Sequence, residues 1–230
     1  EKIKPVLEIM AEIGCPLCIH GEVTDSNIDI FDREKVFINT VLEKIRTDNP
    51  TLKVIIEHIT TKDAVDYVIA GKNNLAATIT THHLAINRND LLAGGIKPHF
   101  YCLPVVKRED HRLALVEAAV SGSPKFFLGT DSAPHLDHDK ESSCGCAGCF
   151  TATNTLEILA HIFEERSALN KLELFTSING AEFYEKNINT DKIKLIKKDK
   201  PVSFPKKLST PLGKITIFKP NFETKWQVLA

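Results

Sequence analysis

Residues 53–58 read KVIIEH, in which three β-branched apolar residues are followed by an acidic residue and a histidine. A short run of this kind is typical of a buried strand. Three other runs have the same character: PLCIH at 16–20, LAATIT at 75–80 and FFLGTD at 126–131. Longer stretches with helical spacing of apolar residues lie between or after them: 32–48, 61–70, 109–121, 153–169 and 172–187. Continuous apolar strands joined by helices predict an α/β fold with a parallel sheet covered on both faces.

The pattern changes after about Asn189. Residues 193–205 are rich in lysine and alternate in polarity, and residues 213–230 (GKITIFKPNFETKWQVLA) have the pattern of strands. We therefore expect an α/β body over residues 1–189, with residues 190–230 as a β-rich tail packed on it and not as a second domain.

The composition is that of an ordinary folded protein. The chain has 230 residues, of which 43% are hydrophobic and 26% charged, and its formal net charge is −1. These values exclude a disordered or collagen-like chain. The balance of charge gives no support for nucleic acid or an anionic membrane as a partner, and no apolar run approaches the ~20 residues of a membrane span. We expect a cytoplasmic protein whose six cysteines are reduced thiols.

Polar residues stand at the carboxyl ends of three strand runs: His20, His58 and Asp131. In a parallel α/β barrel this end of the sheet carries the active site. Two imidazoles and a carboxylate that converge there would suit Zn²⁺. Taken singly, each residue could equally be an ordinary strand-end residue held by a hydrogen bond.

The segment after the fourth strand has two further candidates. His135, in GTDSAPH, could bind an anionic group of a substrate or be an ordinary loop histidine. Cys144, Cys146 and Cys149 could hold a structural zinc with His135 or His138 as the fourth ligand, but their spacing fits no common zinc motif. A tight glycine-containing loop is the better interpretation. His82 and His83 are expected to be structural or solvent-exposed, and no nucleotide-binding motif is present.

Long stretches of the chain resemble bacterial-type (class II) dihydroorotases of the amidohydrolase superfamily. The resemblance rests on six segments: CIHGEVTDSNIDIFDRE from Cys18, IEHITTKDAVDYV from Ile56, LAATITTHHLAINRND from Leu75, GGIKPHFYCLPVVKREDHRLAL from Gly94, FLGTDSAPHLDHDKESSCGCAGCF from Phe127 and SINGAEFY from Ser177. It implies a TIM-type (β/α)8 barrel and the reversible zinc-dependent hydrolysis of dihydroorotate to N-carbamoyl-aspartate, a step of pyrimidine (UMP) biosynthesis.

The resemblance also implies roles for individual residues. Family members bind two zinc ions through an HxH pair on strand one, a carboxylated lysine on strand four, histidines on strands five and six, and an aspartate on strand eight. By resemblance His20, His58 and Asp131 are the last three of these ligands, and Asp131 is also the catalytic acid and base. Substrate contacts are implied for four residues: His20, His135, and the backbones of Leu103 and Ala147.

No HxH occurs in the 230 residues. The resemblance therefore implies that this chain holds strands five to eight and the tail, with strands one to four before Glu1. Lys53 and Lys125 cannot replace the bridging lysine, because both stand at strand starts. We expect the chain alone to be inactive and the complete enzyme to be a homodimer. Two alternatives stay open: another cyclic amidase of the superfamily, such as a hydantoinase-like enzyme, or a non-catalytic half-barrel that serves as an assembly partner.

Overall fold

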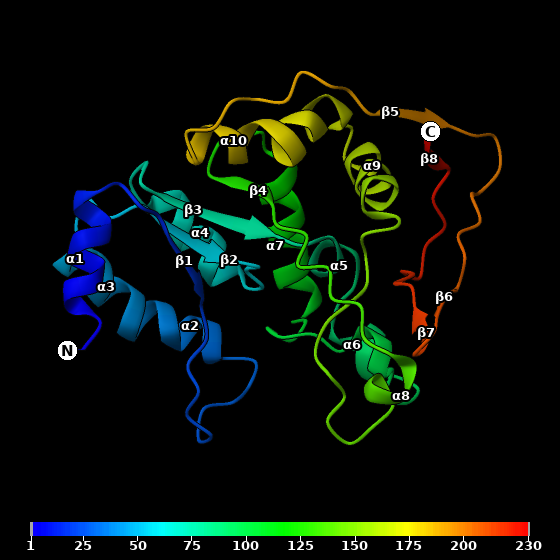
Figure 1. Cartoon of the computed structure of the whole chain (residues 1–230), viewed down its shortest axis with the longest axis horizontal. Helices are drawn as coiled ribbons and strands as arrows, with labels where there is room; N and C mark the ends of the chain where they lie inside the picture. Colours follow the sequence, from blue (N-terminus) through cyan, green and yellow to red (C-terminus); the bar gives the residue numbers. More distant parts are fainter. Residues whose placement is uncertain (1, 230) are drawn as a thin grey trace.

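The computed structural model describes residues 2–229, and its centre is a four-stranded parallel sheet (Figure 1). The strands are β1 (Leu17–His20), β2 (Val54–Glu57), β3 (Leu75–Ile79) and β4 (Phe126–Leu128), and they lie side by side in sequence order. In the register of the sheet, Leu17 lies opposite Val54, Val54 opposite Leu75, and Ala77 opposite Phe126. The carboxyl ends of all four strands therefore lie at the same end of the sheet, as the sequence predicts.

Helices follow each strand. Before β1 lies α1 (Lys4–Glu12), and between β1 and β2 lie α2 (Arg33–Phe37), a π-helical turn (Ile38–Leu42) and α3 (Glu43–Asp48). β2 leads into α4 (Lys62–Ala70), and β3 into α5 (Thr81–Ala85), α6 (Arg88–Leu92), a 3₁₀ turn (Pro98–Phe100) and α7 (Glu109–Val120). After β4 come α8 (Asp137–Lys140), α9 (Thr155–Glu165), a 3₁₀ turn (Leu169–Lys171), a π-helical turn (Leu174–Ile178) and α10 (Asn179–Phe183).

The five predicted helical stretches are all found, with shifted ends, whereas α1, α5, α6 and α8 lie outside them. The stretch predicted at 153–169 is helical only over Thr155–Glu165, and the one predicted at 172–187 ends at Phe183. Local chemistry sets some of the starts: the Thr61 hydroxyl accepts the Ala64 N–H at the beginning of α4, at 3.0 Å. Such a cap satisfies one of the free N–H groups of the first turn.

Successive side chains of the strands pack on opposite faces of the sheet. Val54, Ile56 and Phe126 belong to the large core that the helices cover. Ile55, Ala76 and Phe127 form a second, smaller cluster with Phe183 of α10. At β2 and β3 both faces are therefore buried, which explains why these strands are continuously apolar in the sequence. On β1, Cys18 and His20 are exposed.

The tail forms two small antiparallel sheets. β5 (Lys194–Lys197) pairs with β8 (Trp226–Leu229), and β6 (Lys207–Thr210) pairs with β7 (Gly213–Thr216). In Figure 1 the tail runs from α10 past α9 and returns, so that the C-terminus lies beside β5. The tail is bound to α9: the Trp226 indole N–H donates to Glu164 at 3.1 Å, and the Val228 N–H donates to Glu157 at 3.2 Å. The division at residue 189 stays a prediction.

Within residues 2–229, no helix is both long enough and apolar enough to cross a membrane.

Candidate active site

His20 and His58 meet at the carboxyl end of the sheet. His20 is the last residue of β1, and His58 follows β2 directly in a left-handed backbone conformation, with φ of 42°. His20 Nδ1 lies 3.2 Å from His58 Nε2, and the rings are arranged edge to face with centroids 4.8 Å apart. Two nitrogen atoms thus face each other at the position where the sequence predicts a metal site.

Asp131 lies at the same end, beyond β4, and also has a positive φ, of 40°. Together with His58 it lines a cavity of about 290 Å³, whose other lining residues are Glu57, Thr78 and Gly129. Burial raises the pKa of the Asp131 carboxyl above its usual value, and the neighbouring His20 opposes that shift. Burial, and secondly the proximity of His20, lower the pKa of His58 to about 4. The His58 imidazole is therefore neutral at physiological pH, which is the form that binds metals.

The main chain of His58 is held from the next strand. Thr78 Oγ1 of β3 accepts the His58 N–H at 2.7 Å and donates its own proton to Glu57 at 2.6 Å. Gly129 makes this arrangement possible, because a Cβ at that position would lie 2.6 Å from the Thr78 Cβ. The close approach of β3 and β4 at Thr78 therefore positions His58.

His20 has a carboxylate partner on its other ring nitrogen. His20 Nε2 lies 3.2 Å from Glu22 Oε2, and the second oxygen of Glu22 lies 4.0 Å from Lys107 Nζ. The side chains of Glu22 and Lys107 are almost fully buried. A carboxylate behind an imidazole is common where the imidazole binds a metal, since it fixes the ring orientation and the tautomer. Sequence reasoning missed this role of Glu22, although its position two residues after His20 was a usable signal.

The donors present fit a zinc ion. Two imidazole nitrogens bound to one tetrahedral zinc at about 2.0–2.1 Å lie roughly 3.3 Å apart, close to the 3.2 Å between the His20 and His58 nitrogens. A hydrogen bond between the two rings suits the same distance. The Asp131 carboxylate adds an oxygen donor at the same end of the sheet.

Three of the four predicted substrate contacts lie in loops: His135 before α8, Ala147 after α8, and Leu103 before α7. His135 Nε2 is 3.1 Å from the Ala147 carbonyl oxygen, so the structure brings these two residues together. Leu103 is partly exposed, at 38% of its surface. Neither the Ala147 N–H nor the backbone of Leu103 has a hydrogen-bond partner among residues 2–229. The Ala147 N–H and the backbone of Leu103 are thus free to bind a ligand.

Cys144, Cys146 and Cys149 lie in a tight loop, as the sequence predicts. Gly145 and Gly148 have positive φ values of 71° and 144°. All six cysteines are free thiols. In the described part of the chain, these three cysteines do not gather with His135 or His138 into a metal-ligand cluster.

His82 and His83 are both buried, so the expectation that they could be solvent-exposed is wrong. Their ring nitrogens lie near the Cys102 thiol. His83, however, has no nitrogen left for a metal: Nδ1 pairs with the Thr80 hydroxyl at 2.8 Å, and Nε2 pairs with the Pro104 carbonyl at 2.8 Å. Since that carbonyl only accepts, His83 Nε2 carries the proton. His83 is therefore a structural residue that ties α5 to the loop of Cys102.

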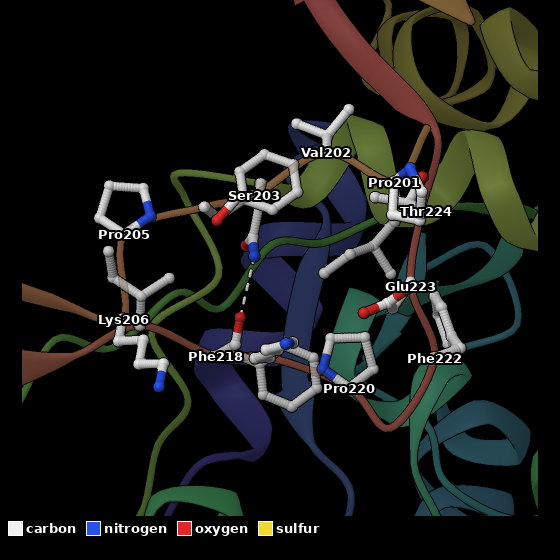
Figure 2. A pocket seen from close by; sticks show the side chains of 15 residues that line it. Pro201, Val202, Ser203, Pro205, Lys206, Phe218, Pro220, Phe222, Glu223 and Thr224 are labelled. Carbon is white, nitrogen blue, oxygen red and sulfur yellow. Dashed lines mark hydrogen bonds between the residues drawn. The ribbon is translucent and has the colours of Figure 1, made fainter. Parts of the chain in front are cut away.

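Figure 2 shows a second cavity, of about 170 Å³, in the tail. Its walls come mainly from residues 201–206 and 217–224, and Asn154 closes it by donating to the Phe218 carbonyl at 2.9 Å. Most of the lining side chains are proline, phenylalanine or aliphatic, and no predicted catalytic residue is among them. This cavity is a gap in the packing between the tail and α9, and it is separate from His20 and His58.

Comparison with known proteins identifies the family, although no family model matches the chain. The dihydroorotase of Ruegeria sp. is 63% identical over 228 residues, which are 99% of this chain and 66% of that protein. The dihydroorotase of Agrobacterium fabrum is 59% identical over 227 residues and is covered to the same extent. The chain belongs to the dihydroorotase family. It spans just under two thirds of the length of these curated relatives.

Solved dihydroorotases have the same fold. The enzyme from Campylobacter jejuni is 35% identical and superposes with a TM-score of 0.88 over 100% of this chain and 66% of its own. The Saccharomyces cerevisiae enzyme, solved with 5-fluoroorotic acid, is 34% identical with the same TM-score. The D-hydantoinase from Bacillus sp. AR9, at 15% identity and a TM-score of 0.76, shares only the fold. The four parallel strands are thus part of a TIM-type α/β barrel, as predicted.

Proposed function

We propose that this chain is part of a dihydroorotase, which interconverts dihydroorotate and N-carbamoyl-aspartate in pyrimidine biosynthesis. The 63% identity to the Ruegeria dihydroorotase carries the proposal. In the hydrolytic direction, water adds its oxygen to a ring carbonyl carbon. The bond from that carbon to the ring nitrogen breaks, and the nitrogen takes up one proton of the water. The resulting carboxylic acid releases the other proton to solvent, so that a carboxylate and a ureido group result.

In this reaction His20, His58 and Asp131 would hold zinc, and the complete site would hold two ions. Bound zinc would polarise the ring carbonyl and lower the pKa of a bound water molecule. Asp131 accepts the proton of the attacking water and then delivers it to the departing nitrogen. Its raised pKa supports this role, because a more basic carboxylate accepts a proton more readily.

Substrate binding falls mainly to the loops of His135, Ala147 and Leu103. His135 binds the carboxylate of the substrate, assisted by the Ala147 N–H, while the Leu103 backbone contacts the ring. His20 lies near the substrate as well as holding metal. The free backbone groups of Ala147 and Leu103 support this assignment. A homodimer, a cytoplasmic location, and the absence of nucleic-acid and membrane partners stay predictions.

The test is an assay of the complete gene product with dihydroorotate, N-carbamoyl-aspartate and a panel of hydantoins. We expect turnover of the first two only. Asp131→Asn removes the proton acceptor and is expected to lower kcat by about 10²–10⁴-fold, whereas Asp199→Asn, in the tail, serves as a control without effect. Turnover of hydantoins in place of dihydroorotate would move the assignment to the hydantoinase-like alternative.

Residues 1–230 alone provide a second test. Without the HxH pair and the bridging lysine, this chain is expected to bind at most one zinc ion weakly and to show no turnover. Equilibrium dialysis against zinc and the same assay measure both properties. Robust turnover, or two tightly bound zinc ions, would contradict the proposed division of the site. Stable association with a chain that carries HxH would favour the assembly-partner alternative.

A further inference from the structure

Lys140, at the end of α8, is a buried lysine whose ammonium group is fully hydrogen-bonded to the main chain. Only 3% of its surface is exposed. Its Nζ donates to the carbonyl oxygens of Tyr101 at 2.8 Å, Cys146 at 2.7 Å and Gly148 at 2.9 Å. An ammonium group has three N–H donors, so each has a partner. Its Nζ forms no salt bridge with a carboxylate of the described residues, so the three carbonyl dipoles compensate its buried positive charge.

The three carbonyls belong to the two loops that carry the proposed backbone contacts to substrate. Tyr101 lies two residues before Leu103, and Cys146 and Gly148 flank Ala147 on both sides. The Gly148 N–H also donates to the Tyr101 carbonyl, at 2.9 Å. One ammonium group and one main-chain hydrogen bond therefore tie these two loops together.

The same loop is packed against the segment after Asp131. The Ala133 N–H donates to the Cys149 carbonyl at 3.0 Å. A Cβ on Gly148 would lie 2.5 Å from Ala133 and 3.1 Å from His135 Nε2. Any movement of the 146–148 segment would consequently change its distance to His135.

We propose that Lys140 is a positioning residue for an anionic substrate: it holds the 101–103 and 146–148 segments together so that the free N–H of Ala147 and the free backbone of Leu103 keep a fixed separation, and its buried charge attracts a carboxylate to them. This inference rests on the proposed function. It adds a residue that touches no substrate atom and acts through the backbone groups that do.

The electrostatics support this role. Burial lowers the pKa of the Lys140 ammonium below its usual value, while hydrogen bonding to three carbonyls favours the charged form. A cation in a water-poor environment attracts an anion more strongly than one in bulk water does. The amides it orients are therefore placed in a positive local potential.

Lys125 is a matched control in the same chain. Its ammonium also donates to three main-chain carbonyls, those of Val68 at 3.1 Å, Ile69 at 3.2 Å and Gly71. It precedes β4 and therefore lies at the opposite end of the sheet from the histidines. Loss of Lys125 removes a comparable set of hydrogen bonds without touching the proposed substrate loops.

The experiment compares Lys140→Met and Lys125→Met in the complete protein by steady-state kinetics, zinc content and thermal unfolding. Both substitutions are expected to lower Tm. Only Lys140→Met is expected to raise the KM for dihydroorotate and for N-carbamoyl-aspartate by at least tenfold, with kcat within threefold and zinc content unchanged. An unchanged KM in Lys140→Met, or an equal rise in Lys125→Met, overturns the positioning role.

Lys140→Arg covers the case in which Lys140→Met does not fold. It keeps the charge, but a planar guanidinium cannot direct donors from one nitrogen to three convergent carbonyls. We expect a KM at least threefold above that of the unsubstituted protein, and an unchanged KM overturns the proposal. If the unsubstituted complete protein shows no dihydroorotase turnover, the proposed function fails and this inference fails with it. If the unsubstituted protein turns over dihydroorotate and the Lys140 variant has an unchanged KM, the positioning role of Lys140 is rejected while the proposed function stands.

Discussion

Glu34 shows how a single buried carboxylate controls the chain after His58. It lies in α2, is 1% exposed, and accepts hydrogen bonds from the main-chain N–H and hydroxyl groups of both Thr60 and Thr61. Four donors on one carboxylate satisfy its accepting capacity, which makes burial of the charge tolerable. The turn that leads from His58 into α4 is thereby fixed to α2.

Replacing this carboxylate tests how much it contributes to the stability of the fold. Glu34→Gln puts an NH₂ group against donors and leaves at least one of them without a partner. We expect a loss of about 3 kcal/mol in the free energy of unfolding, as for a buried hydrogen bond to a charged group, measured by urea denaturation. Glu8→Gln, which breaks an exposed pair with Lys4, should cost less than about 0.5 kcal/mol. An equal loss of stability in the two variants would show that the buried contacts of Glu34 contribute no more than an exposed ion pair.

At the scale of elements, the spacing of β3 and β4 positions the site. The Gly129 N–H donates to the Ile79 carbonyl at 3.3 Å, and the absence of a Cβ lets Thr78 lie directly against the glycine. Thr78 in turn accepts the His58 N–H. The position of His58, directly after β2, therefore depends on Gly129, directly after β4. Thr78 of β3 links the two.

Gly129→Ala is expected to disturb both stability and activity. The added methyl group would push Thr78 away and weaken its hydrogen bond to His58, at a cost of about 1–3 kcal/mol of overpacking. We expect at least a tenfold fall in kcat/KM of the complete protein. Gly180→Ala, which crowds Phe127 at 3.2 Å and does not crowd Thr78, should leave the kinetic constants unchanged. Full activity in Gly129→Ala would contradict the proposed dependence.

For the whole molecule, the most important feature is that the sheet has two edges. Among the described residues, β1 pairs only with β2 and β4 only with β3. Beside this sheet, α1 and the two residues that cap it expose four large apolar side chains, those of Ile3, Val6, Ile9 and Ile13. Unpaired strand edges are templates for association with another chain.

Residues 1–230 alone are consequently expected to associate with rising concentration. Size-exclusion chromatography with light scattering should show species heavier than the 25.6 kDa monomer. Addition of the preceding segment of a related dihydroorotase should reduce that association, because it can pair with both edges. A monomer that stays uniform at high concentration would contradict the prediction.

The sequence by itself determined the elements and the candidate residues. Its continuous apolar runs located all four strands of the sheet. The signal was clearest for β2 and β3, because strands buried on both faces have few polar positions. Parallel strands bring their carboxyl ends to the same end of a sheet, and this allowed His20, His58 and Asp131 to be selected. The segments around GTDSAPH were specific enough to name the family.

Only the tertiary structure decided how these residues are held. Glu34 meets Thr60 and Thr61, Lys140 meets Tyr101, and β5 pairs with β8, each across a long stretch of chain. The local sequence pattern does not predict such contacts, because the residue type alone does not show whether a lysine or glutamate is buried. Burial, and with it the strength of every charge and hydrogen bond at this site, arises from packing between distant segments.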